Sequence, residues 1–195
     1  MSAQERESAK ARPASIHVLR VTLADVEPPV WRRIEVASAS SLAQLHAILQ
    51  AAMGWTNSHL HEFVAGGKRY GRPDPENAGD APMDERKVRL EALLTRAGQE
   101  LSYAYDFGDD WEHTIAVESI ARQVPDRPCP AVTAGGGACP PEDVGGPDGY
   151  REFLEALADP RHERHEELRE WIGGTFDPAA FDREAANRRL RRGRR

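Results

Sequence analysis

Two histidines, His59 and His61, are separated by a single residue in the sequence. The surrounding residues predict a β-strand, in which alternate side chains point to the same face, so the two imidazoles would lie close enough for one metal ion to bridge them. The same pattern is also consistent with a structural role, in which one ring packs at the sheet edge and the other bonds Glu62 or a loop carbonyl. The pair therefore indicates either a metal site or two structural histidines.

A second group of ionisable residues falls within eight positions of the chain, at a predicted hairpin tip: Asp106, Asp109, Asp110, Glu112 and His113. Carboxylates beside a histidine can bind a divalent cation, and two acids in different environments can divide acid and base roles. Asp and Gly are also the residues that a tight turn requires, and charged turn tips are commonly just solvated. His113 shares a predicted strand face with Trp111 and Ile115, so it is either a bonded core histidine or part of a site. Together the two groups predict a divalent metal site, with zinc as the candidate ion, whose ligands are His59, His61, Asp110 and His113.

A Pro- and Gly-rich stretch over residues 122–149 contains both cysteines of the chain, Cys129 and Cys139. Two cysteines are too few for a disulfide framework, so they are expected to be free thiols or metal ligands. The block from Cys139 to Gly146 can serve as a metal loop or as a rim that closes a pocket above the hairpin; alternatively, its acids only cap a helix that starts near Asp148. The pocket interpretation predicts a recognition set made of Trp55, Asp106, Asp109, Trp111, Glu142 and Asp143.

Charge is distributed unevenly along the chain. The formal net charge is −6, and six arginines crowd the last eight residues, so the rest of the chain carries −6 − 6 = −12. An acidic body argues against a broad phosphate-binding face. The arginines predict contact with nucleic acid or with an acidic partner, or they aid solubility; the nucleic-acid interpretation uses Arg188, Arg189, Arg191 and Arg192. His162 and His165 lie among glutamates, which is typical of a solvated surface.

These candidate residues must be positioned by elements that the periodicity predicts. Alternating residues indicate strands over 15–23 and 30–36, a hairpin over 60–65 and 68–70, and a long hairpin over 100–107 and 111–121. Ser41 and Gln44 form a capping-box signature before a helical repeat that ends at Gly54. A short helix is expected over 90–97 and helices after residue 149, with residues 122–149 as a loop.

The element order predicts an α+β fold: a mainly antiparallel sheet built from hairpins, one long packing helix and a helical C-terminal portion. A length of 195 residues fits one domain. We expect that domain over 15–190, a disordered lead over 1–14 and a basic tail over 191–195. The sequence has no apolar run long enough to span a bilayer, and its N-terminus lacks the apolar middle of a signal peptide, so a cytoplasmic protein without a membrane partner is expected.

Five blocks of the sequence resemble the signature blocks of the Ri-plasmid open-reading-frame-three family. They read PPVWRRIEV from Pro28, LAQLHAILQAAMGWTNSHLHEF from Leu42, YDFGDDWEHTIAVE from Tyr105, ACPPEDVGGPDGYREFLEALADP from Ala138, and EWIGGTFDPAAFD ending at Asp182. The resemblance covers residues from about 16 to 190. It implies a shared α+β fold and an association with plasmids and insertion elements, some members being described as transposon passenger proteins of the TnpR type. It implies no established catalytic residues.

One position departs from that resemblance. Members of the family often carry a cysteine where this chain has Val144, which argues against a zinc site made of cysteines here. The leading hypothesis is a mobile-element or plasmid-associated bacterial protein that acts as a binding or accessory module. Its recognition pocket or surface is formed by the His59/His61 strand, the hairpin over 109–113 and the loop over 139–146, and its protein or nucleic-acid partner and oligomeric state are unknown. The alternatives are a metal-assisted hydrolase that uses the His59/His61 and Asp110/His113 cluster, and a nucleic-acid-associated protein that binds through its arginine tail.

Overall fold

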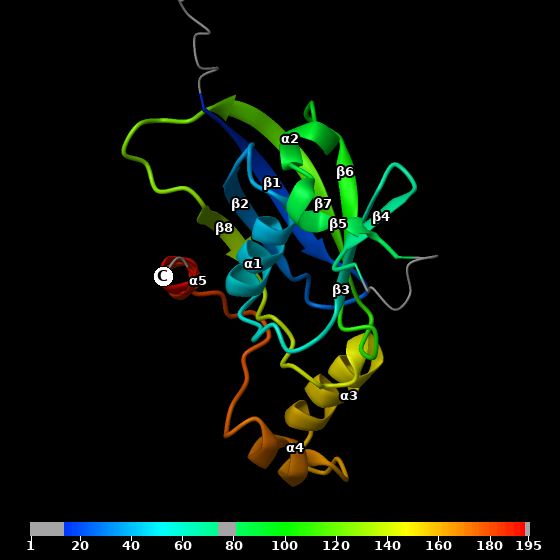
Figure 1. Ribbon diagram of the computed structural model, residues 1–195. Helices are drawn as coiled ribbons and strands as arrows, with labels where there is room; N and C mark the ends of the chain where they lie inside the picture. Colours follow the sequence, from blue (N-terminus) through cyan, green and yellow to red (C-terminus); the bar gives the residue numbers. More distant parts are fainter. Residues whose placement is uncertain (1–13, 74–80, 194–195) are drawn as a thin grey trace, which may run out of the picture.

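A mixed sheet organises the chain in the computed structural model, which describes residues 14–73 and 81–193 (Figure 1). Within these residues the sheet has eight strands in the order β5-β4-β3-β6-β7-β1-β2-β8. Neighbouring strands are antiparallel except β4 and β5, which are parallel. The strands are β1 (Ser15–Leu23), β2 (Trp31–Ala37), β3 (His61–Ala65), β4 (Lys68–Gly71), β5 (Met83–Asp84), β6 (Glu100–Tyr105), β7 (Trp111–Arg122) and β8 (Ala131–Gly136). The expected α+β class and the hairpin construction are confirmed.

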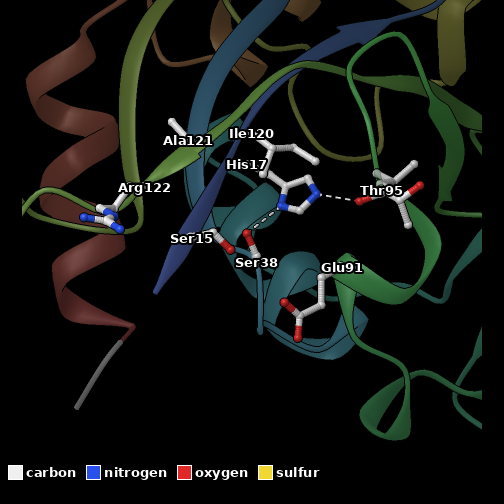
Figure 2. A pocket seen from close by; sticks show the side chains of 9 residues that line it. Ser15, His17, Ser38, Glu91, Thr95, Ile120, Ala121 and Arg122 are labelled. Atoms are coloured by element: carbon white, nitrogen blue, oxygen red, sulfur yellow. Dashed lines mark hydrogen bonds between the residues drawn. The ribbon is translucent and has the colours of Figure 1, made fainter. Parts of the chain in front are cut away.

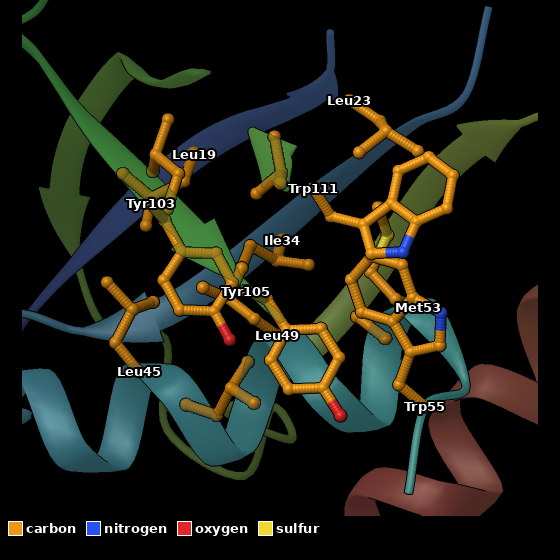
Figure 3. Packing of buried hydrophobic residues seen from close by; sticks show 14 of the residues in the cluster. Leu19, Leu23, Ile34, Leu45, Leu49, Met53, Trp55, Tyr103, Tyr105 and Trp111 are labelled. Atoms are coloured by element: carbon orange, nitrogen blue, oxygen red, sulfur yellow. The ribbon is translucent and has the colours of Figure 1, made fainter. Parts of the chain in front are cut away.

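One long helix, α1 (Leu42–Met53), lies against the sheet. The Ser41 side chain accepts from the Gln44 amide while the Gln44 side chain accepts from the Ser41 amide, so the predicted capping box is present. Gly54 ends the helix at a φ of 102°, in the left-handed region that favours glycine. Leu45, Leu49 and Met53 of α1 pack against side chains of the sheet, as Figure 3 shows.

The chain after β7 departs most from expectation. The stretch predicted as a loop contains β8, which pairs with β2 and extends the sheet by one strand. Its glycines are there for packing: a Cβ on Gly135 would lie 2.6 Å from the Phe181 ring, and one on Gly136 would lie 2.8 Å from Trp31 Nε1. Glycine at these two positions leaves room for the rings of Phe181 and Trp31. Because a glycine-rich stretch is typical of a loop, the sequence did not indicate a strand here.

The remaining helices lie outside the sheet. They are α2 (Leu90–Leu93), α3 (Gly146–Ala158), α4 (His165–Trp171) and α5 (Arg183–Arg192), with a short 3-10 helix over Glu85–Lys87. The helix expected over 90–97 is a single turn. Figure 1 places α3 and α4 beyond one end of the sheet, while α5 packs on α1 and β8. The helical C-terminal portion is therefore confirmed, but it divides into two separate packing units.

Helix α5 includes two residues of the expected basic tail, Arg191 and Arg192. Residues 1–13 of the expected lead and 194–195 of the tail lie outside the described residues. Among the helices that the structure describes, none is both long and apolar enough to cross a bilayer.

Candidate functional site

The imidazole of His59 faces three carboxylates that come from two distant segments of the chain. Its Nε2 atom lies 3.2 Å from Asp143 Oδ1, 3.3 Å from Glu142 Oε2 and 3.5 Å from Asp106 Oδ2. This nitrogen is buried, and within the described residues it makes no hydrogen bond of acceptable geometry. We call His59, Asp106, Glu142 and Asp143 the junction site.

Asp106 reaches the junction site from the end of β6. Its backbone takes a φ of 59°, and its amide donates to the Leu60 carbonyl at 2.8 Å. Its Oδ1 accepts from the Gly108 amide at 3.0 Å, which holds the hairpin tip in shape. The other carboxylate oxygen, Oδ2, is the one that faces His59. One carboxylate thus fixes the turn and still offers an oxygen to the site.

Glu142 likewise accepts structural hydrogen bonds and also faces His59. Its Oε1 accepts from the Thr56 amide at 2.6 Å and from the Tyr105 hydroxyl at 3.2 Å. Burial and the neighbouring Glu142 carboxylate raise the pKa of Tyr105 to about 12, so this hydroxyl remains a donor at neutral pH. Glu142 Oε2 also accepts from the Tyr105 hydroxyl, at 3.3 Å, and faces His59.

The loop that carries Glu142 and Asp143 is fixed to the rest of the molecule at two points. The Trp55 indole Nε1 donates to the Pro140 carbonyl at 3.0 Å, and its ring stacks on Tyr105 with centroids 4.9 Å apart. At the other end of the loop, the Gly145 amide donates to Asp109 Oδ2 at 3.2 Å. Gly146 has a φ of 68°, and a Cβ there would collide with the Asp109 carbonyl. The aromatic side chains of this region, Trp55, Tyr105 and Trp111, lie together above the end of α1 in Figure 3.

The spacing of the junction site suits a metal ion. One ligand atom each from His59, Asp106 and Asp143 lies within 4.8 Å of the others. A tetrahedral zinc site with bonds of about 2.0–2.1 Å has ligand-to-ligand edges of about 3.3 Å, close to the three nitrogen-to-oxygen distances above. One imidazole nitrogen together with carboxylate oxygens is a donor set that suits a divalent cation of borderline softness, such as zinc.

The junction site is open on one side. The side chain of Asp143 is 73% exposed, whereas those of Asp106 and Glu142 are mostly covered. Two large apolar residues that directly follow site residues are exposed as well, Leu60 at 64% and Phe107 at 56%. A small cavity of about 150 Å³ adjoins Asp143 and is bounded by Val144, Leu168 and Trp171. Val144, at the departing position, packs partly against the core.

His61, predicted to share a metal with His59, has a different environment. Strand β3 begins at His61, so His59 lies in the preceding loop and strand alternation does not govern it. The His61 Nε2 atom bonds Glu85 Oε2 at 2.8 Å, and its ring stacks on His46 with centroids 3.4 Å apart. The expected pairing of His59 with His61 is therefore not formed in this structure.

His113 and Asp110, the other two predicted metal ligands, also lie outside the junction site. The His113 Nδ1 atom bonds the carbonyls of Tyr103 at 3.1 Å and Trp111 at 3.0 Å. Burial lowers the pKa of His113 to about 4, so the ring is neutral at physiological pH. Asp110 is exposed at the turn, with a φ of 55°. His113 is thus a core histidine that packs edge-on against Trp55.

The two cysteines do not assemble into a metal site in the described residues. Cys129 Sγ lies 3.8 Å from the Glu35 carbonyl, and the two cysteines form no disulfide. Burial raises the pKa of Cys139 to about 12, so it is a thiol and a poor metal ligand at neutral pH.

The four arginines predicted to contact nucleic acid lie on α5. Arg189 donates from Nε to the Ala51 carbonyl at 2.8 Å, so it fastens α5 to α1. Arg188 lies 3.4 Å from Asp182, and Arg191 and Arg192 are exposed. Leu190 is buried between them, so this segment is part of the fold. Of the pair His162 and His165, the latter is partly buried and bonds the Ala156 carbonyl at 2.8 Å.

The residues of the predicted recognition set lie in one region of the structure. Asp106, Glu142 and Asp143 meet at the junction site, Asp109 holds the loop, and Trp55 and Trp111 lie in the aromatic group beside it. Sequence reasoning placed the His59/His61 strand, the hairpin over 109–113 and the loop over 139–146 around one recognition surface, but it did not pair the His59 imidazole with these three acids. It also missed the His46, His61 and Glu85 cluster, whose members are far apart in the chain and share no motif.

Three comparisons place the chain among known proteins. A family described as plasmid pRiA4b ORF-3-like protein matches residues 15–185. An uncharacterised protein of Sinorhizobium fredii is 49% identical over 184 residues, covering 90% of each chain. The crystal structure of a protein of unknown function from Methanosarcina mazei Go1 matches with a TM-score of 0.80 and 35% identity, over 89% of this chain and 98% of that one. None of these descriptions states a ligand or a reaction.

Proposed function

We propose a metal-dependent recognition role for this chain, which belongs to the plasmid pRiA4b ORF-3-like family. The junction site holds one divalent cation, zinc being the best fit, and presents it to a ligand at the surface. This proposal rests on the buried Nε2 atom of His59, which has no hydrogen bond within residues 14–73 and 81–193 and lies within 3.5 Å of three carboxylate oxygens.

The donor set favours zinc over calcium or magnesium. The latter two are hard cations that prefer oxygen ligands alone, whereas an imidazole among carboxylates suits zinc. His59, Asp106 and Asp143 are the ligands, and Glu142 either joins them or bonds a ligand at the ion. Asp143 lies at the open side, so a position remains for a donor atom from outside the protein.

The surroundings support recognition more than hydrolysis. A metal-assisted hydrolase that used His61, Asp110 and His113 would need these residues at the ion, but His61 is bonded to Glu85, His113 to two carbonyls, and Asp110 faces solvent. Leu60 and Phe107, which directly follow His59 and Asp106 in the chain, are instead exposed apolar side chains. We take them as the apolar part of a recognition surface, so a ligand that offers one metal-binding atom beside an apolar group is expected.

Metal content and affinity test the proposal. Tag-free protein, stripped with chelator and titrated with Zn²⁺ in a calorimeter, is expected to bind one equivalent. His59→Ala should lower the affinity by at least about 100-fold, since it removes the nitrogen ligand. His162→Ala is the matched control for adventitious binding by a surface histidine and should bind like the wild type. One equivalent bound equally by His59→Ala, or no binding by folded wild-type protein, would refute the proposal.

A further inference from the structure

A second cavity lies at the opposite end of β7 from the junction site. The junction site adjoins the start of this 12-residue strand at Trp111, and the cavity adjoins its last residues. Its volume is about 530 Å³. Figure 2 shows side chains that line it. Its walls combine apolar with hydroxyl, imidazole and charged side chains, among them His17, Ser38, Glu91, Leu94, Thr95 and Ile120.

His17 and Ser38 form a hydrogen-bonded pair in the cavity wall. His17 Nδ1 lies 2.9 Å from Ser38 Oγ, and its Nε2 lies 2.7 Å from the Leu94 carbonyl oxygen. A carbonyl oxygen only accepts, so Nε2 must carry the ring hydrogen. Nδ1 of the neutral ring then has a free lone pair, and the Ser38 hydroxyl donates to it. The Leu94 carbonyl thus orients the His17 ring so that Nδ1 faces the Ser38 hydroxyl, which is the arrangement of a nucleophile with its general base.

The backbone around Ser38 suits a nucleophile. Ser38 lies directly after β2 and shortly before α1, in a turn closed by a 2.9 Å bond from the Ser40 amide to the Ala37 carbonyl. Its neighbours Ala37 and Ala39 are small. Within the described residues the Ala39 amide donates to no acceptor. Strand, serine, turn and helix is the order in which nucleophilic serines of α/β-hydrolases are presented, and there the amide after the serine stabilises the oxyanion.

We propose that Ser38 is a nucleophile activated by His17 and that the cavity accepts the acyl group of a small ester or thioester. Ser38 Oγ attacks the acyl carbonyl carbon, and His17 Nδ1 takes the hydroxyl proton. The bond from that carbon to the leaving oxygen or sulfur breaks, and His17 returns the proton to the leaving group. Water then cleaves the acyl-serine ester, releasing a carboxylic acid and restoring the Ser38 hydroxyl. Leu94 and Ile120 give the apolar wall that a short acyl chain needs.

A fluorophosphonate probe tests this activity without knowledge of the natural ester. The serine oxygen forms a bond to phosphorus, the phosphorus–fluorine bond breaks, and the hydroxyl proton leaves through His17 with the fluoride. Intact-mass and peptide-mapping spectra of the folded wild-type chain are expected to show one adduct, on Ser38. Protein unfolded in guanidinium should be labelled at least about 100-fold more slowly, because the base is no longer in place.

Variants separate the nucleophile from its surroundings. Ser38→Ala should abolish labelling, and His17→Gln should slow it by about 100-fold or more. Ser15→Ala changes a serine of the same cavity and should be labelled like the wild type. Chelator should have no effect, because the ligands of the proposed metal lie at the other end of β7. The peptide map of the wild type shows whether Ser38 carries the adduct, so the proposal can be tested even if a variant fails to fold. No adduct, an adduct on another residue, or equal labelling of folded His17→Gln would overturn the proposal.

Discussion

Two clusters that combine histidines with acids adjoin the α1–β3 connection, and they differ in how their polar atoms are bonded. In the buried cluster, His61 bonds Glu85, while His46 bonds the Tyr103 hydroxyl at 2.8 Å and the Asn57 side chain at 2.7 Å. In the junction site, His59 Nε2 faces three acids and bonds none of them with acceptable geometry.

We infer a role for His59 from its carboxylate neighbours as well as from the missing bond, because the core histidine His113 also has a buried Nε2 atom without a hydrogen bond within the described residues. Buried polar groups that are bonded within the protein hold the fold together, since leaving one unpaired costs free energy. A nitrogen without such a bond, surrounded by oxygens that are otherwise held in place, has its bonding capacity available to a ligand. In the proposed function, the two histidines of the HLH segment have different roles although only Leu60 lies between them.

The buried cluster should give the largest loss of stability. Glu85→Ala leaves His61 without its acceptor in the interior and is expected to lower the free energy of unfolding by about 3 kcal/mol or more. Urea denaturation followed by Trp fluorescence measures this change. Glu85→Gln keeps an acceptor oxygen and should lose less. A change below about 1 kcal/mol in Glu85→Ala would contradict the structural role of this cluster.

Acid should destabilise the protein through two buried histidines. Burial is the main cause that lowers the pKa of His46 and of His113 to about 4 in the folded state, from an ordinary value of 6.5. Between pH 6.5 and 4 the unfolded chain therefore binds more protons than the folded one, and stability falls as pH falls. Each histidine accounts for roughly 2–3 kcal/mol at pH 4.

Denaturation curves at pH 7, 5.5 and 4.5 measure this slope. His46→Gln should flatten part of it, at a cost in stability that does not depend on pH. A wild-type slope that was unchanged in both His46→Gln and His113→Gln would contradict the assignment of these groups.

The contact between hairpin and loop should give an intermediate effect. Gly146→Ala places a methyl group against the Asp109 carbonyl at a positive φ, which is expected to cost about 1–3 kcal/mol. Because the loop carries Glu142 and Asp143, the affinity for Zn²⁺ should also fall, by about tenfold or more. Gly173 also has a positive φ, but no atom of the described residues lies within 4 Å of a Cβ there, so Gly173→Ala controls for backbone strain alone. Equal Zn²⁺ affinity in both variants would show that this contact does not position the site.

The smallest effect on stability is expected at the exposed ligand. Asp143→Ala should change the free energy of unfolding by no more than about 0.5 kcal/mol, because its side chain is largely solvent-exposed. Its affinity for Zn²⁺ should nevertheless fall by about 100-fold, as for the loss of a direct ligand. Stable protein that no longer binds zinc is the opposite of the outcome expected for Glu85→Ala. A variant that still binds zinc normally would remove Asp143 from the ligand set.

Local signals made most of the fold predictable. The capping box at Ser41 and the glycine at Gly54 give both ends of α1, and alternation gives the strands of both hairpins. Strand β8 was not predictable, because its glycines exist to admit Phe181 and Trp31, residues that only the folded chain brings near.

The candidate site was predictable in its components but not in its assembly. His59 and the three acids were each identified, but alternation was applied to His59 as if the strand already began there. Asp106 and Glu142 are 36 residues apart, and both are placed by contacts of loops whose path depends on packing, through the bonds of Tyr105 and the Thr56 amide. Local sequence patterns do not predict contacts between loops that are far apart in the chain.

Anomalous diffraction from zinc-soaked crystals of the chelator-treated protein tests the central claim most directly. We predict one strong peak, about 2.0–2.2 Å from His59 Nε2 and within bonding distance of Asp106 Oδ2 and Asp143 Oδ1. A zinc peak at His61, His113 or the cysteines instead, or no peak beside His59 at saturating zinc, would contradict it.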